Sequence, residues 1–213
     1  MTRTLSFQLR SLDETRSFAR TLAALATPGD VVLLSGDLGA GKTTLVRALA
    51  EALGVDPRVV SSPTFTVMNA YDGAHIDPIV HMDAYRLEGE DEGELLELGW
   101  DDATRGASLT LVEWGERIER VLVGLVEDEP ARITLSHLGE TSRGAAVTLP
   151  ESWASRAGFA GLAALAEGTD GDDTSRPGFP FSSEREQLAD LYHWFGEAYR
   201  ISRPIQATDD DDA

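Results

Sequence analysis

The amino-acid sequence predicts an α/β fold with a largely parallel central sheet. Two continuous apolar runs, VVLLS at 31–35 and SLTLVEW at 108–114, are typical of parallel strands that are covered on both faces. A glycine-rich loop, GDLGAGK, follows the first run and precedes an apolar helical stretch. Alternating apolar and polar residues at 131–138 and 144–150 predict an antiparallel hairpin at one edge of the sheet.

The N-terminal elements follow from local signals. LSFQL at 5–9 predicts a short strand. The following SLDE has the spacing of a capping box, so we expect a helix that Ser11 caps and that runs to about Ala26. After the glycine-rich loop, TTLVRALAEALG predicts a helix over 43–54 that ends at its glycine.

The middle of the chain contains two more predicted strands. TVMNAY at 66–71 is the first, and IVHMDAYRL contains the second. Because alternate residues of a strand share a face, this second strand places His81, Asp83 and Tyr85 on one side. We expect His81 to be structural rather than a proton shuttle. The acidic stretch 88–99 predicts a short helix.

The character of the chain changes near Pro150, which predicts a domain over 1–150 and a C-terminal extension over 151–213. Within the extension we expect a helix at 151–166, a linker at 166–180 and an amphipathic helix at 183–200, before a disordered acidic tail.

The composition narrows the classes of function. The formal net charge is −19, whereas unaided binding of nucleic acid relies on Lys and Arg that neutralise phosphates. The chain has no cysteine, which excludes disulfides and thiolate metal sites. It shows no apolar signal core and no apolar run of membrane-spanning length, so we expect a cytoplasmic protein without a membrane partner.

Residues 36–43, GDLGAGKT, match the phosphate-loop pattern, with a buried strand before and a helix after. Glycines let the backbone approach phosphates, and the helix N-terminus favours their negative charge. Lys42 is the one lysine among 18 basic residues, which indicates a site where a planar guanidinium cannot replace a compact charge. We expect Lys42 to reach the β- and γ-phosphates of ATP and Thr43 to ligate Mg²⁺. The expected nucleotide contacts of the loop are Gly36, Gly39, Ala40, Gly41, Lys42, Thr43 and Thr44.

Such a site needs a second carboxylate at the end of a neighbouring strand. Asp83 and Glu113 both end predicted strands. One would hold Mg²⁺ and the other would orient or deprotonate the attacking water, and the spacing leaves open which does which. SSPTF at 61–65 is typical of a switch loop, in which the Thr64 hydroxyl meets Mg²⁺ or the γ-phosphate when ATP is bound.

Four blocks in this order, GDLGAGKTT, SSPTFTV, HMDAYRL and LVEW, resemble the TsaE family over residues 5–150. The resemblance implies a P-loop ATPase domain with a three-layer α/β/α sandwich. It also implies an ATPase that binds the TsaB–TsaD pair. That pair modifies adenosine with a threonylcarbamoyl group in tRNAs that read codons beginning with A.

The resemblance also implies roles for single residues. Lys42 and Thr43 match the nucleotide and Mg²⁺ residues of the family, and Glu113 matches its metal-side glutamate. Asp83 and Trp114 match positions tied to ATP hydrolysis. Thr15 matches a nucleotide contact in the first helix. Residues 151–213 extend beyond the family core.

We therefore expect an ATPase that its partner pair stimulates and that is not itself the transferase. Contact with tRNA would be only indirect, through that complex. Two other functions stay open from the residues: a small-molecule kinase with the same loop, and a nucleotide-switched binding module with negligible catalysis. An arginine finger is not evident, although Arg86 is a candidate.

Overall fold

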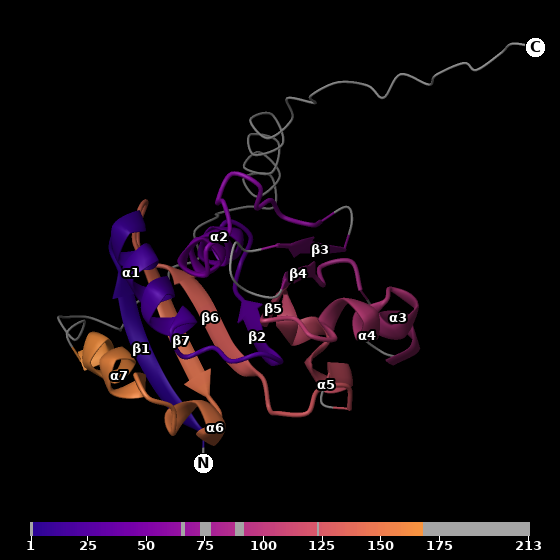
Figure 1. Ribbon diagram of the computed structural model, residues 1–213. Coiled ribbons are helices and arrows are strands. Elements are labelled where there is room, and N and C mark those ends of the chain that lie inside the picture. The colour runs from indigo at the N-terminus through magenta and orange to yellow at the C-terminus, as the bar shows by residue number, and fades with distance from the viewer. Residues whose placement is uncertain (1, 65–66, 73–77, 88–91, 123, 168–213) are drawn as a thin grey trace, which may run out of the picture. The chain divides into compact units, whose positions relative to one another are not determined.

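The computed structural model describes residues 2–64, 67–72, 78–87, 92–122 and 124–167 of the chain, and these form a mixed α/β fold on a single sheet (Figure 1). The strands are β1 (Arg3–Leu9), β2 (Asp30–Ser35), β3 (Met68–Tyr71), β4 (Ile79–Asp83), β5 (Leu109–Glu113), β6 (Ala131–His137) and β7 (Arg143–Leu149). The helices are α1 (Leu12–Ala23), α2 (Lys42–Ala52), α3 (Glu92–Glu97), α4 (Trp100–Thr104), the 3₁₀ helix η1 (Gly115–Arg117), α5 (Glu119–Leu122), α6 (Glu151–Ala154) and α7 (Phe159–Glu167).

The sheet has the strand order β1-β7-β6-β2-β5-β4-β3. Its four central strands, β6, β2, β5 and β4, are parallel, whereas β1, β7 and β3 join through antiparallel pairs. The two apolar runs of the sequence are β2 and β5, and they lie side by side in the middle. This confirms the predicted α/β class with a mostly parallel centre.

The hairpin of β6 and β7 forms as predicted, but its predicted place at the sheet edge is wrong. β7 also pairs with β1, so β1 is the edge strand on this side. The pairing buries Phe7 and Leu9 of β1 in the same apolar cluster as Val147 and Leu149 of β7. Alternation within the hairpin reveals its buried face, but not which strand covers its outer edge.

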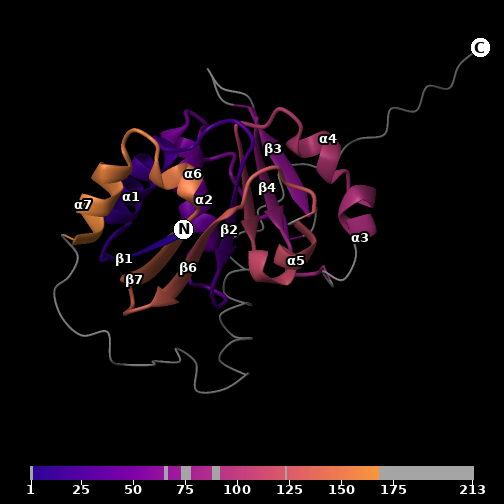
Figure 2. The same cartoon turned by 90° about the horizontal axis from the view of Figure 1, so that it is seen from below.

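Helices cover both faces of the sheet, which is why β2 is apolar at its four central positions, 31–34. Val32 and Leu34 face a core that contains residues of α1, α2, α6 and α7. Val31 and Leu33 face a second core, which contains residues of α3, α4 and α5. Figure 2 shows these two groups of helices apart from each other.

The first helix begins as the sequence predicts. The Ser11 hydroxyl accepts a hydrogen bond from the Glu14 N–H at 3.2 Å, and the Glu14 carboxylate reaches back to the Arg10 N–H at 2.7 Å. The helix ends at Ala23 rather than near Ala26, because the N–H groups of Leu25 and Ala26 bond three positions back and tighten the last turn.

The packed core continues beyond residue 150. Trp153 of α6 and Leu162 of α7 are almost fully buried in the first core. Residues 168–213, which hold most of the predicted linker, the helix expected at 183–200 and the acidic tail, lie outside the described residues. Within the part of the chain that is described, none of the helices has the length and apolar character needed to cross a bilayer.

A buried ion pair ties the segment between α6 and α7 to the start of β2. The Arg156 guanidinium donates to both carboxylate oxygens of Asp30, at 2.5 and 2.8 Å, and to the Leu25 carbonyl at 3.0 Å. Asp30 is 5% exposed and also accepts from the Thr27 N–H at 2.6 Å. This pair therefore fixes the C-terminal helices to the N-terminal end of a central strand.

We predict that Arg156→Ala lowers the free energy of unfolding by about 3–5 kcal/mol, because Asp30 would keep its buried charge without its cation. Urea unfolding monitored by circular dichroism measures the change. Arg58→Ala is the matched control, since Arg58 pairs with Asp56 at the surface and its loss should be undetectable. Equal effects of the two substitutions would contradict the prediction.

Candidate functional site

The predicted site residues gather at the carboxyl ends of the central parallel strands, where ligands of open α/β sheets usually bind. β2 runs into the glycine-rich loop, and α2 begins directly after it at Lys42. Asp83 ends β4 and Glu113 ends β5, and these two residues are register partners. Glu113 in turn lies beside Leu34 of β2, so the loop and both carboxylates share one edge.

The glycine-rich loop lies tightly against β6. Gly36 has φ 132°, and a Cβ atom on it would collide with the carbonyl group of Leu135. Gly41, the N-cap residue of α2, has φ 100°, and no side chain caps the first N–H groups of this helix. The loop therefore depends on glycine and leaves the start of α2 open to an anionic ligand.

Lys42 is a largely buried cation, since the residue is only 5% exposed. Its Nζ donates to the carbonyls of Gly36 at 2.6 Å and Asp37 at 2.9 Å, and it lies 3.8 Å from the centre of the Trp114 ring. Burial lowers the pKa of Lys42 below 10.5, although Glu113 and other nearby carboxylates oppose the shift. The amine is thus held by neutral carbonyl partners beside an open helix terminus.

Trp114 takes its position from an unusual backbone. It has φ 58°, in the left-handed region, and the following Gly115 packs so closely on Leu33 that a Cβ would lie 2.6 Å from the Leu33 Cβ. The Trp114 ring contacts Tyr85, with ring centres 5.1 Å apart, as well as Lys42. The strained turn after β5 therefore aims this ring at the loop.

Glu113 joins the sheet to the start of α2. Its Oε1 atom accepts hydrogen bonds from the Thr43 hydroxyl at 2.7 Å and from His81 Nε2 at 2.9 Å. Glu113 is 3% exposed and His81 is fully buried. The carboxylate is therefore tied to the residue that the sequence assigns to Mg²⁺.

Asp83 contacts a different segment, the loop at 61–64. Its Oδ2 atom accepts from the Thr64 hydroxyl at 2.7 Å and, at 3.4 Å, from the Ser62 hydroxyl. Its Oδ1 atom accepts from the Tyr85 N–H at 2.9 Å. The two strand-end carboxylates thus have different partners: Glu113 accepts from Thr43 at the start of α2, and Asp83 accepts from the predicted switch loop.

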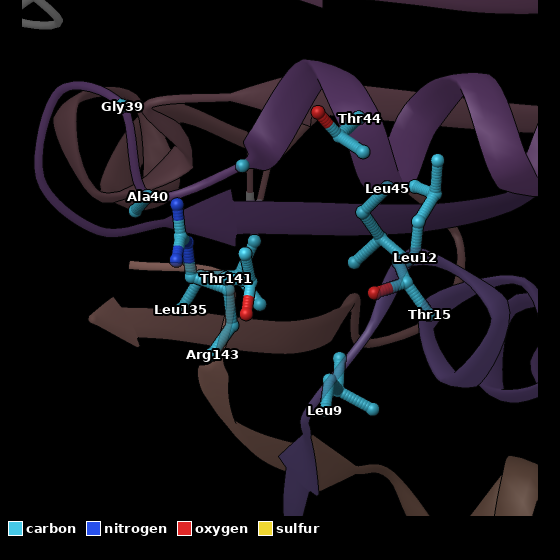
Figure 3. A pocket seen from close by; sticks show the side chains of 11 residues that line it. Leu9, Leu12, Thr15, Gly39, Ala40, Thr44, Leu45, Leu135, Thr141 and Arg143 are labelled. Atoms are coloured by element: carbon cyan, nitrogen blue, oxygen red, sulfur yellow. The ribbon is translucent and has the colours of Figure 1, made fainter. Parts of the chain in front are cut away.

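A cavity of about 300 Å³ lies beside the glycine-rich loop (Figure 3). Its lining includes Leu9, Leu12, Thr15, Thr44, Leu45 and Arg143. The leucines supply apolar surface, while the hydroxyls and the guanidinium supply polar groups. A pocket of this composition suits a flat, partly polar ligand such as a nucleoside.

The structure places the predicted site residues in two groups around the glycine-rich loop. The first comprises Lys42, Thr43, Thr64, Asp83, Glu113 and Trp114. The second, which lines the cavity, comprises Thr15, Gly39, Ala40, Gly41 and Thr44. Gly36 lies at the base of the loop. Arg86 is exposed.

Sequence reasoning missed two residues. Arg143 lines the cavity because β7 brings it beside the loop, and nothing in the local sequence indicates this. Burial lowers its pKa, and its guanidinium donates to the carbonyls of Gly139, Glu140 and Ser142. Tyr71 is the second, since its hydroxyl lies between the 61–64 loop and His81.

The oxygen atoms of Thr43 and Glu113 suit Mg²⁺ better than a transition metal. Mg²⁺ usually takes one or two protein oxygens and completes its shell with water and phosphate oxygens. In the described residues there is no group of three or more His, Cys, Asp or Glu that could hold a metal by itself. The site thus fits a cation that arrives together with a phosphate ligand.

Known proteins are similar in sequence to the part of the chain that contains these residues. A family model described as "Threonylcarbamoyl adenosine biosynthesis protein TsaE" matches residues 9–145, more than half of the chain. A Bacillus subtilis protein named "tRNA threonylcarbamoyladenosine biosynthesis protein TsaE" is 43% identical over 131 residues, covering 62% of this chain and 77% of the relative. A Streptomyces coelicolor protein of the same name is 45% identical over 143 residues, covering 59% of this chain and 91% of the relative.

A solved structure is also similar. The crystal structure of Bacillus subtilis YdiB superposes with a TM-score of 0.58 at 32% identity, covering 80% of this chain and 99% of that chain. The residues that the family model matches include the glycine-rich loop and both strand-end carboxylates. Helices α6 and α7 lie beyond them.

We predict that Lys42→Met stabilises the nucleotide-free protein against unfolding, and that this gain shrinks as the pH rises. The pKa of Lys42 is lowered on folding, so holding the charged amine costs free energy below the folded pKa. That cost disappears as the pH rises from the folded pKa to 10.5, because the amine loses its proton in the folded protein first. Over this pH range the free energy of unfolding of the wild type therefore rises relative to that of the variant. Unfolding free energies of both proteins at pH 7, 9 and 10.5 measure the difference.

The control for this prediction is Arg58→Met, which also removes one positive charge but from an exposed side chain. Its difference from the wild type should not vary over the same pH range. A Lys42→Met difference that stays constant with pH would contradict the account of Lys42.

Proposed function

Because this chain belongs to the TsaE family of tRNA threonylcarbamoyladenosine biosynthesis proteins, we propose that it is a Mg²⁺-dependent ATPase with a P-loop fold. The observation that carries the proposal is the hydrogen bond between Thr43 and Glu113 beside buried Lys42. It joins the hydroxyl that begins a helix after a glycine-rich loop to a carboxylate that ends the neighbouring strand. This pairing is what the metal side of a P-loop nucleotide site requires.

The proposed ATP site uses both groups of residues around the loop. The cavity next to Leu12 and Thr15 would take the nucleoside, and Arg143 adds a charge at its rim. The phosphates would lie along the loop and the open start of α2. Lys42 would then exchange the carbonyls of its own loop for phosphate oxygens, which are stronger partners for a poorly solvated amine.

The different partners of the two carboxylates support a division of roles. Thr43 and Glu113 would hold Mg²⁺, which when bound neutralises charge on the phosphate oxygens. Asp83 contacts the 61–64 loop instead, and it would orient the attacking water or accept its proton. Thr64, which donates to Asp83, would be the residue through which this loop senses the nucleotide.

The proposed partners are the TsaB–TsaD pair. Among the described residues, Lys42 is the cation that lies beside both carboxylates, so a further positive charge for the transition state would come from the pair. The net charge of −19 disfavours direct contact with tRNA and favours a basic partner surface. The protein would support threonylcarbamoylation without performing the transfer.

We predict that the purified protein hydrolyses Mg-ATP slowly alone and faster with the TsaB–TsaD pair. Lys42→Ala and Glu113→Gln should each lower turnover by about 10²–10³-fold, because Lys42 stabilises negative charge in the transition state and Glu113 would hold the Mg²⁺ that does the same. Phosphate release measured with and without the pair tests this. Arg58→Ala, at an exposed site away from the loop, serves as the control and should leave turnover unchanged.

Two outcomes would contradict the proposed function. Full-speed hydrolysis by the isolated protein, with no effect of the pair, would refute partner dependence. Transfer of the γ-phosphate to a small molecule in place of phosphate release would identify a kinase instead.

A further inference from the structure

His81 is a fully buried histidine in the middle of β4, with Glu113 at one ring nitrogen and the Tyr71 hydroxyl near the other. Its Nε2 atom lies 2.9 Å from Glu113 Oε1, and its Nδ1 atom lies 3.4 Å from the Tyr71 hydroxyl. Because an ionised carboxylate only accepts hydrogen bonds, His81 Nε2 carries a proton and donates it to Glu113. The histidine therefore holds the same Glu113 oxygen that the Thr43 hydroxyl contacts.

Tyr71 extends this contact to the 61–64 loop. Its hydroxyl donates to the Ser61 carbonyl at 2.9 Å and accepts from the Ser61 N–H at 3.4 Å and the Asn69 amide at 3.2 Å. Tyr71 thereby holds both backbone groups of Ser61. The residue is 8% exposed, so water does not compete well for these bonds.

The loop at 61–64 is thus tied to the two strand-end carboxylates by separate routes. Ser62 and Thr64 contact Asp83 directly through their hydroxyls. Ser61 is connected to Glu113 indirectly. The Tyr71 hydroxyl gives its one proton to the Ser61 carbonyl and lies in contact with His81 Nδ1 at 3.4 Å, and His81 Nε2 donates to Glu113. A change at Glu113 when ligand arrives would therefore act on the backbone at the start of the same loop.

We propose that His81 is a positioning residue for Glu113, and that the path from Ser61 through Tyr71 and His81 to Glu113 couples the 61–64 loop to the Mg²⁺-nucleotide site. The inference rests on the proposed function and adds a named connection to it. An apolar residue of similar volume at position 81 would fill the space of the imidazole. Of the two hydrogen bonds to Glu113 Oε1, it would remove the one from His81 and leave the one from Thr43. Partners of metal-side ligands typically affect metal affinity strongly.

Two substitutions at position 81 separate positioning from packing. In His81→Gln the side-chain amide reaches the place of Nε2, so a donor to Glu113 is kept. In His81→Asn the amide reaches only the place of Nδ1, so this donor is lost. For each variant we would measure the affinity for a fluorescent ADP analogue once in Mg²⁺ and once in EDTA. The ratio of the two affinities is the gain that Mg²⁺ produces.

We expect His81→Asn to lower this Mg²⁺-dependent gain by about 10-fold or more, with affinity in EDTA unchanged within about 2-fold. His81→Gln should retain most of the gain. Equal losses in the two variants, or equal losses in Mg²⁺ and EDTA, would overturn the positioning role. Absence of nucleotide binding by the wild type would instead overturn the proposed function together with this inference.

A measurement on the wild type keeps the proposal testable if either variant fails to fold. The buried Nε2–H of His81 should give a slowly exchanging imidazole resonance in nuclear magnetic resonance spectra. Addition of Mg²⁺ to the ADP-bound protein should shift this resonance, because its acceptor contacts the metal side of the site. A resonance that does not respond would overturn the inference.

The coupling to the loop is tested by Tyr71→Phe, which removes the hydroxyl that holds Ser61. In the wild type, Mg²⁺-nucleotide should change the hydrogen-exchange protection of the Ser61, Ser62 and Thr64 amides. In the variant this response should be lost at Ser61, while the Mg²⁺-dependent gain in ADP affinity stays within about 3-fold of the wild type. A normal loop response in the variant would overturn the coupling.

Discussion

One carboxylate oxygen, Oε1 of Glu113, connects the parts of the candidate site. It accepts from Thr43 at the start of α2 and from His81 in the adjacent strand β4. The glycine-rich loop, the sheet and the route to the 61–64 loop therefore meet at one atom. This arrangement is possible because β2, β4 and β5 are parallel and end at the same edge, in a register that pairs Asp83 with Glu113.

Buried polar residues are concentrated where this chemistry would take place. Lys42, His81, Asp83 and Glu113 are each 5% exposed or less, and all four lie at this edge of the sheet. Burying charge is costly, and each of these groups retains partners that a ligand could replace or reinforce. The cost is offset by two apolar cores, which enclose β2 from both faces. The fold thus holds a strained, poorly solvated site on a rigid support.

The opposite end of β2 is held just as firmly, but for stability. Asp30 begins this strand and pairs with Arg156 of the segment between α6 and α7. The residues beyond 150 therefore complete the core, while the matched family region ends at 145. The strand that leads into the glycine-rich loop is anchored at its start by a buried ion pair and at its end by tight packing of Gly36 on β6.

The sequence by itself determined the local features of this protein. The apolar runs at β2 and β5, the strand–loop–helix around Lys42 and the capping of α1 all follow from residue patterns that act over a few residues. Tyr85, which the alternation placed on one strand face with His81, lies instead in the turn after β4. The tertiary structure alone decided how distant segments meet. Pairing of β1 with β7 moves the hairpin inside the sheet, and β7 then brings Arg143 to the cavity. Pairing of β3 with β4 places Tyr71 near His81, and the different contacts of Asp83 and Glu113 depend on loops far apart in sequence. Strand order and register depend on long-range burial, which local residue patterns do not specify.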